Sequence, residues 1–181
     1  MENNQNTSGS DRRPMLTGMF ADRESTEQAY NALHERGYSK EDINLVMSDE
    51  TKKKHYSDEN DTSELGTKAA ETAGTGSAIG GTIGAIAGVI AAIGTSVLIP
   101  GLGLIIAGPL AAGLAGACVG GITGGLIGAL VGSGIPEDRA KIYESGINSG
   151  HVVMGVHPRN DEDAEYLENS WKSNRGQNIY R

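Results

Sequence analysis

The chain has 181 residues, a formal net charge of −8, 27 glycines and few aromatic residues. The acidic balance argues against a nucleic-acid-binding protein, because affinity for phosphate needs a clustered basic surface. A single cysteine, Cys118, excludes an intrachain disulfide and a cysteine-rich metal site, and it fits a reducing compartment.

The charged residues avoid the middle of the chain. No Asp, Glu, Lys or Arg lies between Glu71 and Glu137, and the same stretch holds 19 of the 27 glycines. The composition therefore predicts two polar flanks around an apolar, glycine-rich insert.

The first flank predicts a β-α-β unit. Residues 1–13 lack the basic start and apolar run of a secretory signal, so they predict a disordered tail and flanks that stay in the cytosol. Over residues 14–48, the strand "MLTGMF" precedes a helix capped by Asp22 and ended before Gly37, and the strand "INLVM" follows. Residues 49–71 are almost wholly polar and predict a linker.

The apolar insert, residues 72–135, predicts a helical hairpin with its turn at residues 99–103. Each arm could extend roughly 40 Å as a helix, which exceeds the roughly 30 Å of a bilayer's hydrocarbon core. Glycines repeat every four residues in both arms and predict a glycine zipper, in which flat faces let two helix backbones approach closely. The predicted turn residues are Pro100, Gly101 and Gly103, and the predicted helix-packing and oligomerisation residues are Gly76, Gly80, Gly84, Gly88, Gly108, Gly116, Gly120, Gly124, Gly128 and Gly132.

A row of bulky apolar residues occupies the other face of each arm, with Ile79, Ile83 and Ile86 in the first arm and Leu126 and Leu130 in the second. Lipid would cover these rows in a membrane hairpin, whereas other subunits would cover them in a soluble oligomer. The absence of charge and the length of the arms favour the membrane, although neither flank has an excess of basic residues beside the insert.

The second flank, residues 136–181, predicts a helix, a strand, a helix and a short edge strand. Pro136 suits the first turn of the first helix, and "HVVMGVH" alternates like a strand. The second helix is capped at Asn160 or Asp161 and carries Trp171, and "QNIY" predicts the edge strand. The two flanks together give the order β-α-β … α-β-α-β. This order predicts an α+β fold, a ferredoxin-like split sandwich interrupted by the glycine-zipper hairpin.

Three features together resemble a bacterial general stress protein family of the heat-induced type. They are "LTGMFADRESTEQAYNALHERGYSKEDINLVM", the long glycine zipper, and "GIPEDRAKIYESGINSGHVVMGVHP", and the resemblance covers about residues 15–181. It implies a stress-associated role and a split α+β domain around a glycine-rich insert. It implies no known reaction, and no catalytic residues can be carried over from it.

The motifs predict no enzyme, no cofactor and no metal site. The glycine-rich insert contains neither GxGxxG nor GxxxxGK[ST], and it has no lysine that could meet a phosphate. His151 and His157 would lie about 20 Å apart along a strand, too far for one metal ion. The acids from Asp161 to Glu165 are expected in the first turn of a helix.

These observations predict a non-enzymatic bacterial stress protein that self-assembles through its glycine-zipper hairpin. The predicted location is the cytoplasmic membrane, with both termini in the cytosol, and the predicted partners are further copies of the chain and the lipid bilayer. Two alternatives stay open: a cytoplasmic soluble homo-oligomer with the hairpins in a common core, and a ligand-sensing α+β regulatory module.

Overall fold

A computed structural model describes residues 14–56, 97–99, 103–111, 125–132 and 134–181. Two parts of the apolar insert lie outside these ranges, and we name them the first apolar stretch (residues 72–96) and the second apolar stretch (residues 112–124). The predicted tail, residues 1–13, and residues 57–71 of the predicted linker also lie outside them.

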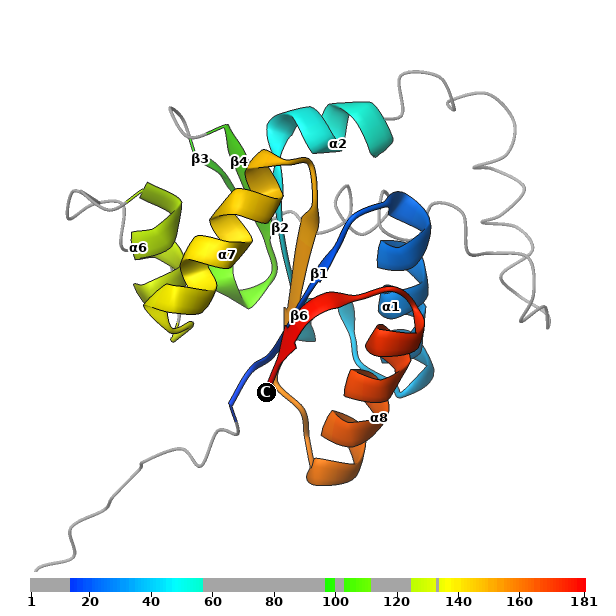
Figure 1. Cartoon of the computed structure of the whole chain (residues 1–181). Helices are drawn as coiled ribbons and strands as arrows, with labels where there is room; N and C mark the ends of the chain where they lie inside the picture. The colour runs from blue at the N-terminus through cyan, green and yellow to red at the C-terminus, as the bar shows by residue number, and fades with distance from the viewer. Residues whose placement is uncertain (1–13, 57–96, 100–102, 112–124, 133) are drawn as a thin grey trace, which may run out of the picture.

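The described residues form an α+β fold around a six-stranded antiparallel sheet (Figure 1). The strand order is β3-β4-β2-β5-β1-β6. Strand β5 lies between β2 and β1, so that the second flank inserts a strand between two strands of the first. The strands are β1 (Leu16–Phe20), β2 (Ile43–Ser48), β3 (Val97–Ile99), β4 (Leu104–Ala107), β5 (Val152–Val156) and β6 (Gln177–Tyr180).

Helices cover both faces of this sheet (Figure 1). Helices α1 (Arg23–Glu35) and α8 (Asp161–Ser173) lie side by side on one face, and α6 (Gly125–Gly132) packs beside α7 (Glu137–Asn148) on the other. Helix α2 (Asp49–His55) follows β2 at one end of the sheet.

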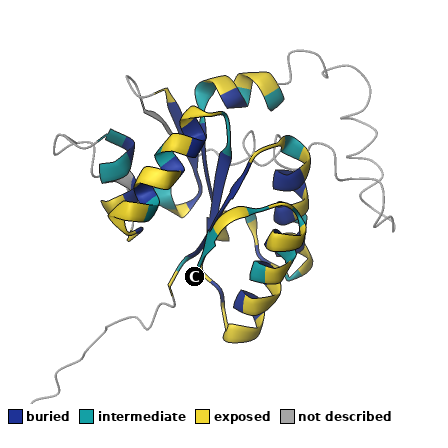
Figure 2. Cartoon of the chain, viewed as in Figure 1, coloured by how far each residue is buried: buried dark blue, intermediate teal, exposed yellow. Residues whose placement is uncertain are grey.

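Alternating side chains of the strands divide the core into two layers. Met154 of β5 is buried in the layer under α1 and α8, whereas the adjacent Val153 is buried in the layer under α6 and α7. Trp171 of α8 is fully buried, donates from Nε1 to the Ala29 carbonyl at 3.2 Å and meets the Phe20 ring edge to face. Figure 2 shows that burial is concentrated in the strands and on the inner faces of the helices.

The flanking elements confirm the predicted order of strands and helices. The side chain of Asp22 accepts a hydrogen bond from the Ser25 amide at the start of α1, and that of Asn160 accepts from the Asp163 amide at the start of α8. Gly37 follows α1 with φ of +75°, the left-handed conformation that ends helices.

The predicted linker over residues 49–71 is wrong in its first part, because residues 49–55 form α2. The Ser48 hydroxyl accepts a hydrogen bond from the Thr51 amide and caps this helix. Thr51 and Tyr56 are buried against the domain and help to hold this mostly polar segment in place.

The predicted helical hairpin is also wrong at residues 97–99 and 104–107, which are strands. The predicted turn at residues 99–103 therefore falls between the paired strands β3 and β4, with Gly103 at φ of +59°, and residues 100–102 lie outside the described residues. Strand β4 pairs with β2 and buries Ile105 in one core layer and Ile106 in the other. The apolar run Leu104–Ala107 is thus covered on both faces of the sheet, as is typical of a strand in the interior of a domain.

Residues 125–132 are helical, as the hairpin predicted, and form α6. Across the described ranges, no helix combines the length and the apolar character needed to cross a membrane.

Candidate functional site

The predicted helix-packing glycines fall into two groups in the structure. Among the predicted packing and turn residues, Gly103, Gly108, Gly128 and Gly132 lie in the described ranges: Gly103 directly before β4, Gly108 directly after it, and Gly128 and Gly132 in α6. The other predicted packing and turn residues lie outside the described residues: Gly76, Gly80, Gly84, Gly88, Pro100, Gly101, Gly116, Gly120 and Gly124.

Gly108 does not belong to a helix stripe, which corrects its predicted role. It follows β4 with φ of +92°, a conformation that side chains disfavour. A Cβ atom built on Gly108 would collide with the backbone carbonyl oxygen of Ile43. Glycine is needed here for the bend of the backbone and for its close approach to β2.

Gly128 and Gly132 lie in α6 and keep the spacing of the predicted stripe. Gly132 is exposed, and nothing lies within 4 Å of the position its Cβ would take. On the inner side of the same helix, Leu126 and Leu130 are buried in the core layer shared with α7. The domain itself therefore covers this part of the predicted bulky row.

A buried asparagine anchors the chain where it leaves the sheet after β4. The Asn44 side-chain oxygen accepts a hydrogen bond of 2.8 Å from the Leu110 amide, and its nitrogen donates to the Gly155 carbonyl at 3.3 Å. Asn44 is 2 % exposed, and Ala111 is fully buried. These contacts hold residues 108–111 against β2 and β5, directly before the second apolar stretch.

The chain is held equally firmly where it leaves α2. Arg23 of α1 donates from Nη1 to the His55 carbonyl at 3.0 Å and places its guanidinium over the Tyr56 ring at 5.7 Å. Burial, the largest effect, raises the pKa of Tyr56 above its ordinary value. An ion pair of 2.7 Å between Arg23 and Glu27 orients the guanidinium.

These anchors define the candidate functional site: an α+β domain that fixes the chain on both sides of each apolar stretch, at Tyr56 and β3 for the first and at residues 108–111 and α6 for the second. Comparison with protein-family models, curated proteins and solved structures finds no match.

The polar clusters of the domain join its two flanks. The Tyr38 hydroxyl donates to the Asp163 carboxylate and accepts from the Arg159 amide, both at 2.9 Å. The Arg159 guanidinium lies over the Tyr38 ring and donates to the Gly37 carbonyl at 2.7 Å. On the opposite face, Tyr143 forms a buried hydrogen bond of 2.7 Å with Thr17.

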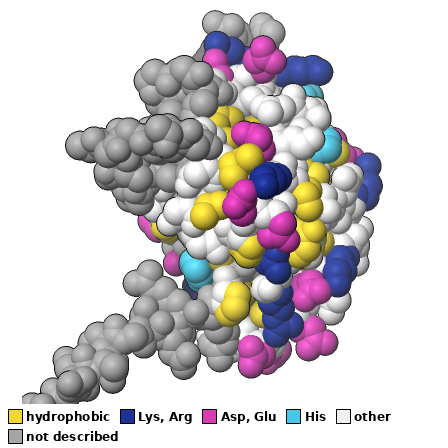
Figure 3. Space-filling model, turned by 60° about the vertical axis from the view of Figure 1, so that its left-hand side comes forward, with side chains coloured by type: hydrophobic (Ala, Val, Ile, Leu, Met, Phe, Trp, Pro, Cys, Tyr) yellow, Lys and Arg dark blue, Asp and Glu magenta, His cyan; other side chains and the backbone are white. Residues whose placement is uncertain are grey.

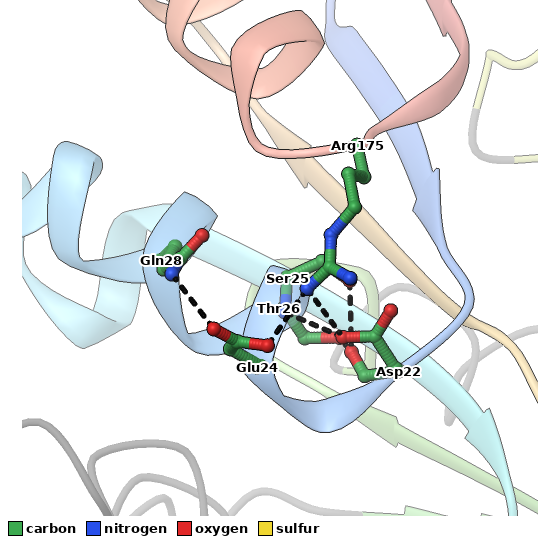
Figure 4. A network of polar contacts seen from close by, with 6 residues as sticks. All are labelled: Asp22, Glu24, Ser25, Thr26, Gln28 and Arg175. Carbon is green, nitrogen blue, oxygen red and sulfur yellow. Dashed lines mark hydrogen bonds and ion pairs between the residues drawn. The ribbon is translucent and has the colours of Figure 1, made fainter.

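A third cluster joins the end of α8 to the start of α1 (Figure 4). Arg175 contacts Glu24 at 2.8 Å and the capping residue Asp22 at 3.4 Å. These clusters have no signal in the sequence because their members lie more than 100 residues apart. Only the capping function of Asp22 had a local signal.

The histidines and the acidic residues form no metal-binding group in the described part of the chain. His151 and His157 flank β5, and Asp163 lies in the first turn of α8 with its carboxylate engaged by Tyr38. Among the described residues, no group of three or more His, Cys, Asp or Glu side chains could hold a metal ion.

Few large apolar side chains are exposed on the described part of the domain. They are Val131 of α6, Ile142 of α7 and Tyr166 of α8. In the view of Figure 3, hydrophobic side chains lie in small groups between acidic and basic ones. Such scattered residues are ordinary for a protein surface.

Proposed function

We propose that the chain is a non-enzymatic bacterial general stress protein that associates with itself and with membrane lipid through its apolar stretches. In this proposal the α+β domain stays on the cytosolic side and serves as the base that holds the stretches. Further copies of the chain and lipid are the partners, and no cofactor is involved.

One observation carries the proposal: both faces of the sheet are already covered by the domain's own helices. The first apolar stretch has glycines every four residues and a row of isoleucines, whereas strands β1, β2, β4 and β5 are already buried on both faces in the described part of the domain. Apolar surface of this extent must be removed from water by another molecule. A second copy fits the flat glycine face, and lipid fits the isoleucines.

We also propose that the domain is a split ferredoxin-like sandwich. The units β1-α1-β2 and β5-α8-β6 support this assignment, with the strand order β6-β1-β5-β2 and both helices on one face. Strands β3 and β4 and helices α6 and α7 would then be additions contributed around the apolar insert.

A second candidate is a soluble homo-oligomer in which the apolar stretches form a common core. It is favoured by Leu126 and Leu130, which belong to the predicted bulky row and are covered by protein. In this candidate the same kind of packing would continue between subunits.

Fractionation of the full chain followed by mass measurement tests the proposal. The informative variant carries Gly80→Leu with Gly120→Leu, which places bulk on both glycine stripes. The matched control carries Gly81→Leu with Gly121→Leu, the same change about 100° around a helix. We expect the wild type and the control to assemble and the stripe variant to have a smaller mass.

Three outcomes separate the possibilities. Equal mass for the stripe variant and the wild type contradicts self-association through the glycines. A wild-type protein that sediments with membranes supports the lipid association. A discrete large particle in the detergent-free soluble fraction supports the soluble oligomer instead.

A further inference from the structure

Met15 differs from the other described methionines in its exposure to water. Met19, Met47 and Met154 are 4 %, 1 % and 0 % exposed, whereas Met15, directly before β1, is only partly buried. Its side chain packs at the rim of the core layer that lies under α6 and α7. An oxidant dissolved in water should therefore reach the Met15 thioether more readily than the other three.

Gly155 of β5 leaves the space that the Met15 side chain fills. The Met15 sulfur lies 3.1 Å from the position that a Cβ atom on Gly155 would take. Thr17 is the partner of Gly155 in the pairing of β1 with β5, and Met15 lies two residues before it on the same side of the sheet. The missing side chain thus lets Met15 lie across β5.

On the far side of Gly155, the Met15 sulfur contacts Asn44 of β2. Asn44 is the partner of Gly155 in the pairing of β2 with β5, and its Nδ2 donates to the Gly155 carbonyl at 3.3 Å and to Met15 Sδ at 3.8 Å. The side-chain oxygen of Asn44 accepts from the Leu110 amide at 2.8 Å. Met15 therefore contacts the side chain that holds the chain after β4 to the sheet.

We propose that Met15 is a methionine oxidation site and that its oxidation state is transmitted to the chain after β4 through Asn44. The oxidant is hydrogen peroxide. A lone pair of Met15 Sδ attacks one peroxide oxygen, the O–O bond breaks, and that oxygen stays on sulfur as the sulfoxide. The other oxygen takes up the proton of the transferred one and leaves as water. Sulfur loses two electrons in this step, and the peroxide gains them.

The sulfoxide weakens the contact between Met15 and Asn44. The sulfur carries the positive end of the S–O dipole, and it faces the positive hydrogens of the Asn44 amide. The new polar group is also better solvated in water than at an apolar rim, so it moves the side chain outward. Asn44 then loses one of the contacts that orient its amide, and its hydrogen bond to the Leu110 amide opens more easily.

Peroxide treatment of the folded full chain, followed by mass spectrometry, tests the site. The chain carries Cys118→Ser so that a thiol does not consume the oxidant, and fragment ions separate Met15 from Met19 on their shared tryptic peptide. We expect Met15 to form sulfoxide about tenfold faster than Met19, Met47 and Met154. In denaturing urea all four should react at similar rates, because the selectivity comes from burial.

Hydrogen exchange at the Leu110 amide tests the transmission. We expect exchange to be about threefold faster after oxidation, and to return to its initial rate after treatment with a methionine sulfoxide reductase and a dithiol. Met15→Leu keeps an apolar side chain of similar volume without sulfur, so it should make the exchange insensitive to peroxide. Met19→Leu is the matched control and should keep the response.

Two sets of results would overturn the proposal. Equal rates of oxidation at Met15 and Met19 in the folded chain overturn the oxidation site. Unchanged exchange at Leu110 in the Met15 sulfoxide form overturns the transmission through Asn44, and so does a peroxide response that persists in Met15→Leu.

Discussion

At the scale of single residues, glycine has two different roles in this chain. Gly108 has a positive φ and faces the Ile43 carbonyl, whereas Gly132 ends α6 in open space. Spacing along the sequence placed both in one stripe. Spacing cannot reveal φ, and the close approach at Gly108 involves a strand more than 60 residues away.

Gly108→Ala should lower the free energy of unfolding by about 3 kcal/mol, because the new Cβ adds steric collision to a strained backbone. Gly132→Ala is the matched control and should change it by no more than about 0.5 kcal/mol. Urea unfolding followed by circular dichroism measures both. Equal effects of the two substitutions would contradict the distinct role of Gly108.

Tyr143 links stability to alkaline pH. Its hydroxyl bonds Thr17 at 2.7 Å and donates to the Asn178 carbonyl at 3.0 Å. Burial, the largest effect, raises the pKa of Tyr143 from 10.0 to about 12. The unfolded chain therefore loses this proton first, so the stabilisation is complete below pH 10 and is lost between pH 10 and 12.

Tyr143→Phe should cost about 1 to 2 kcal/mol at neutral pH, since one buried and one partly buried hydrogen bond are lost. The difference from wild type should shrink as pH rises from 10 towards 12, because phenylalanine has no proton to lose. Urea midpoints at a series of pH values measure this difference. A constant difference over that range would show that Tyr143 does not titrate as the structure requires.

At the scale of elements, local sequence signals predicted the helices and strands that have a clear hydrophobic period or a capping residue. Helix α1 has its Asp22 cap, α8 its Asn160 cap, and β5 its alternating pattern. Helix α2 was missed because its seven residues are mostly charged and only Thr51 is buried. Strand β4 was missed because a short apolar run inside a helix-like pattern has no period of its own.

Asn44 should control how tightly the chain after β4 is held. Asn44→Ala removes the acceptor of the Leu110 amide and the donor to Gly155, which should cost about 2 kcal/mol. Hydrogen exchange at the Leu110 amide should accelerate accordingly. Asn174→Ala, which removes only a half-buried contact with Ser170, should change stability by less than about 0.5 kcal/mol. Unchanged exchange at Leu110 would argue against the anchor.

At the scale of the whole molecule, the domain and the first apolar stretch should be separable. The described residues of both core layers all lie outside that stretch. Self-association and lipid binding, in contrast, are assigned to the stretch. Architecture and assembly can therefore be changed independently.

Replacing residues 72–92 by a glycine-serine sequence of equal length tests this separation. The loop length is unchanged, so the free energy of unfolding should stay within about 1 kcal/mol of the wild type. Assembly and membrane sedimentation should be lost. A large loss of stability would show that the stretch contributes to the core of the domain.

The overall arrangement was predictable from the flanks but not from the insert. Binary patterns over residues 14–48 and 136–181 sufficed for four strands and three helices in the right order. The apolar insert carries the same residue types whether they form β4, α6 or a packing stripe. Which of these forms depends on partners such as β2 and α7, and those partners are remote in sequence.

The pairing of β1 has a consequence for synthesis of the protein. Among the described strands, β1 pairs only with β5 and β6. Both strands lie late in the chain, and the earlier of them, β5, begins at Val152. At roughly 5–20 residues per second, several seconds or more separate the emergence of these partners from the ribosome. During that interval both apolar stretches emerge while the sheet is unfinished. Loss of a ribosome-bound chaperone that covers apolar segments should therefore lower the yield of this protein more than it lowers the stability of the completed chain.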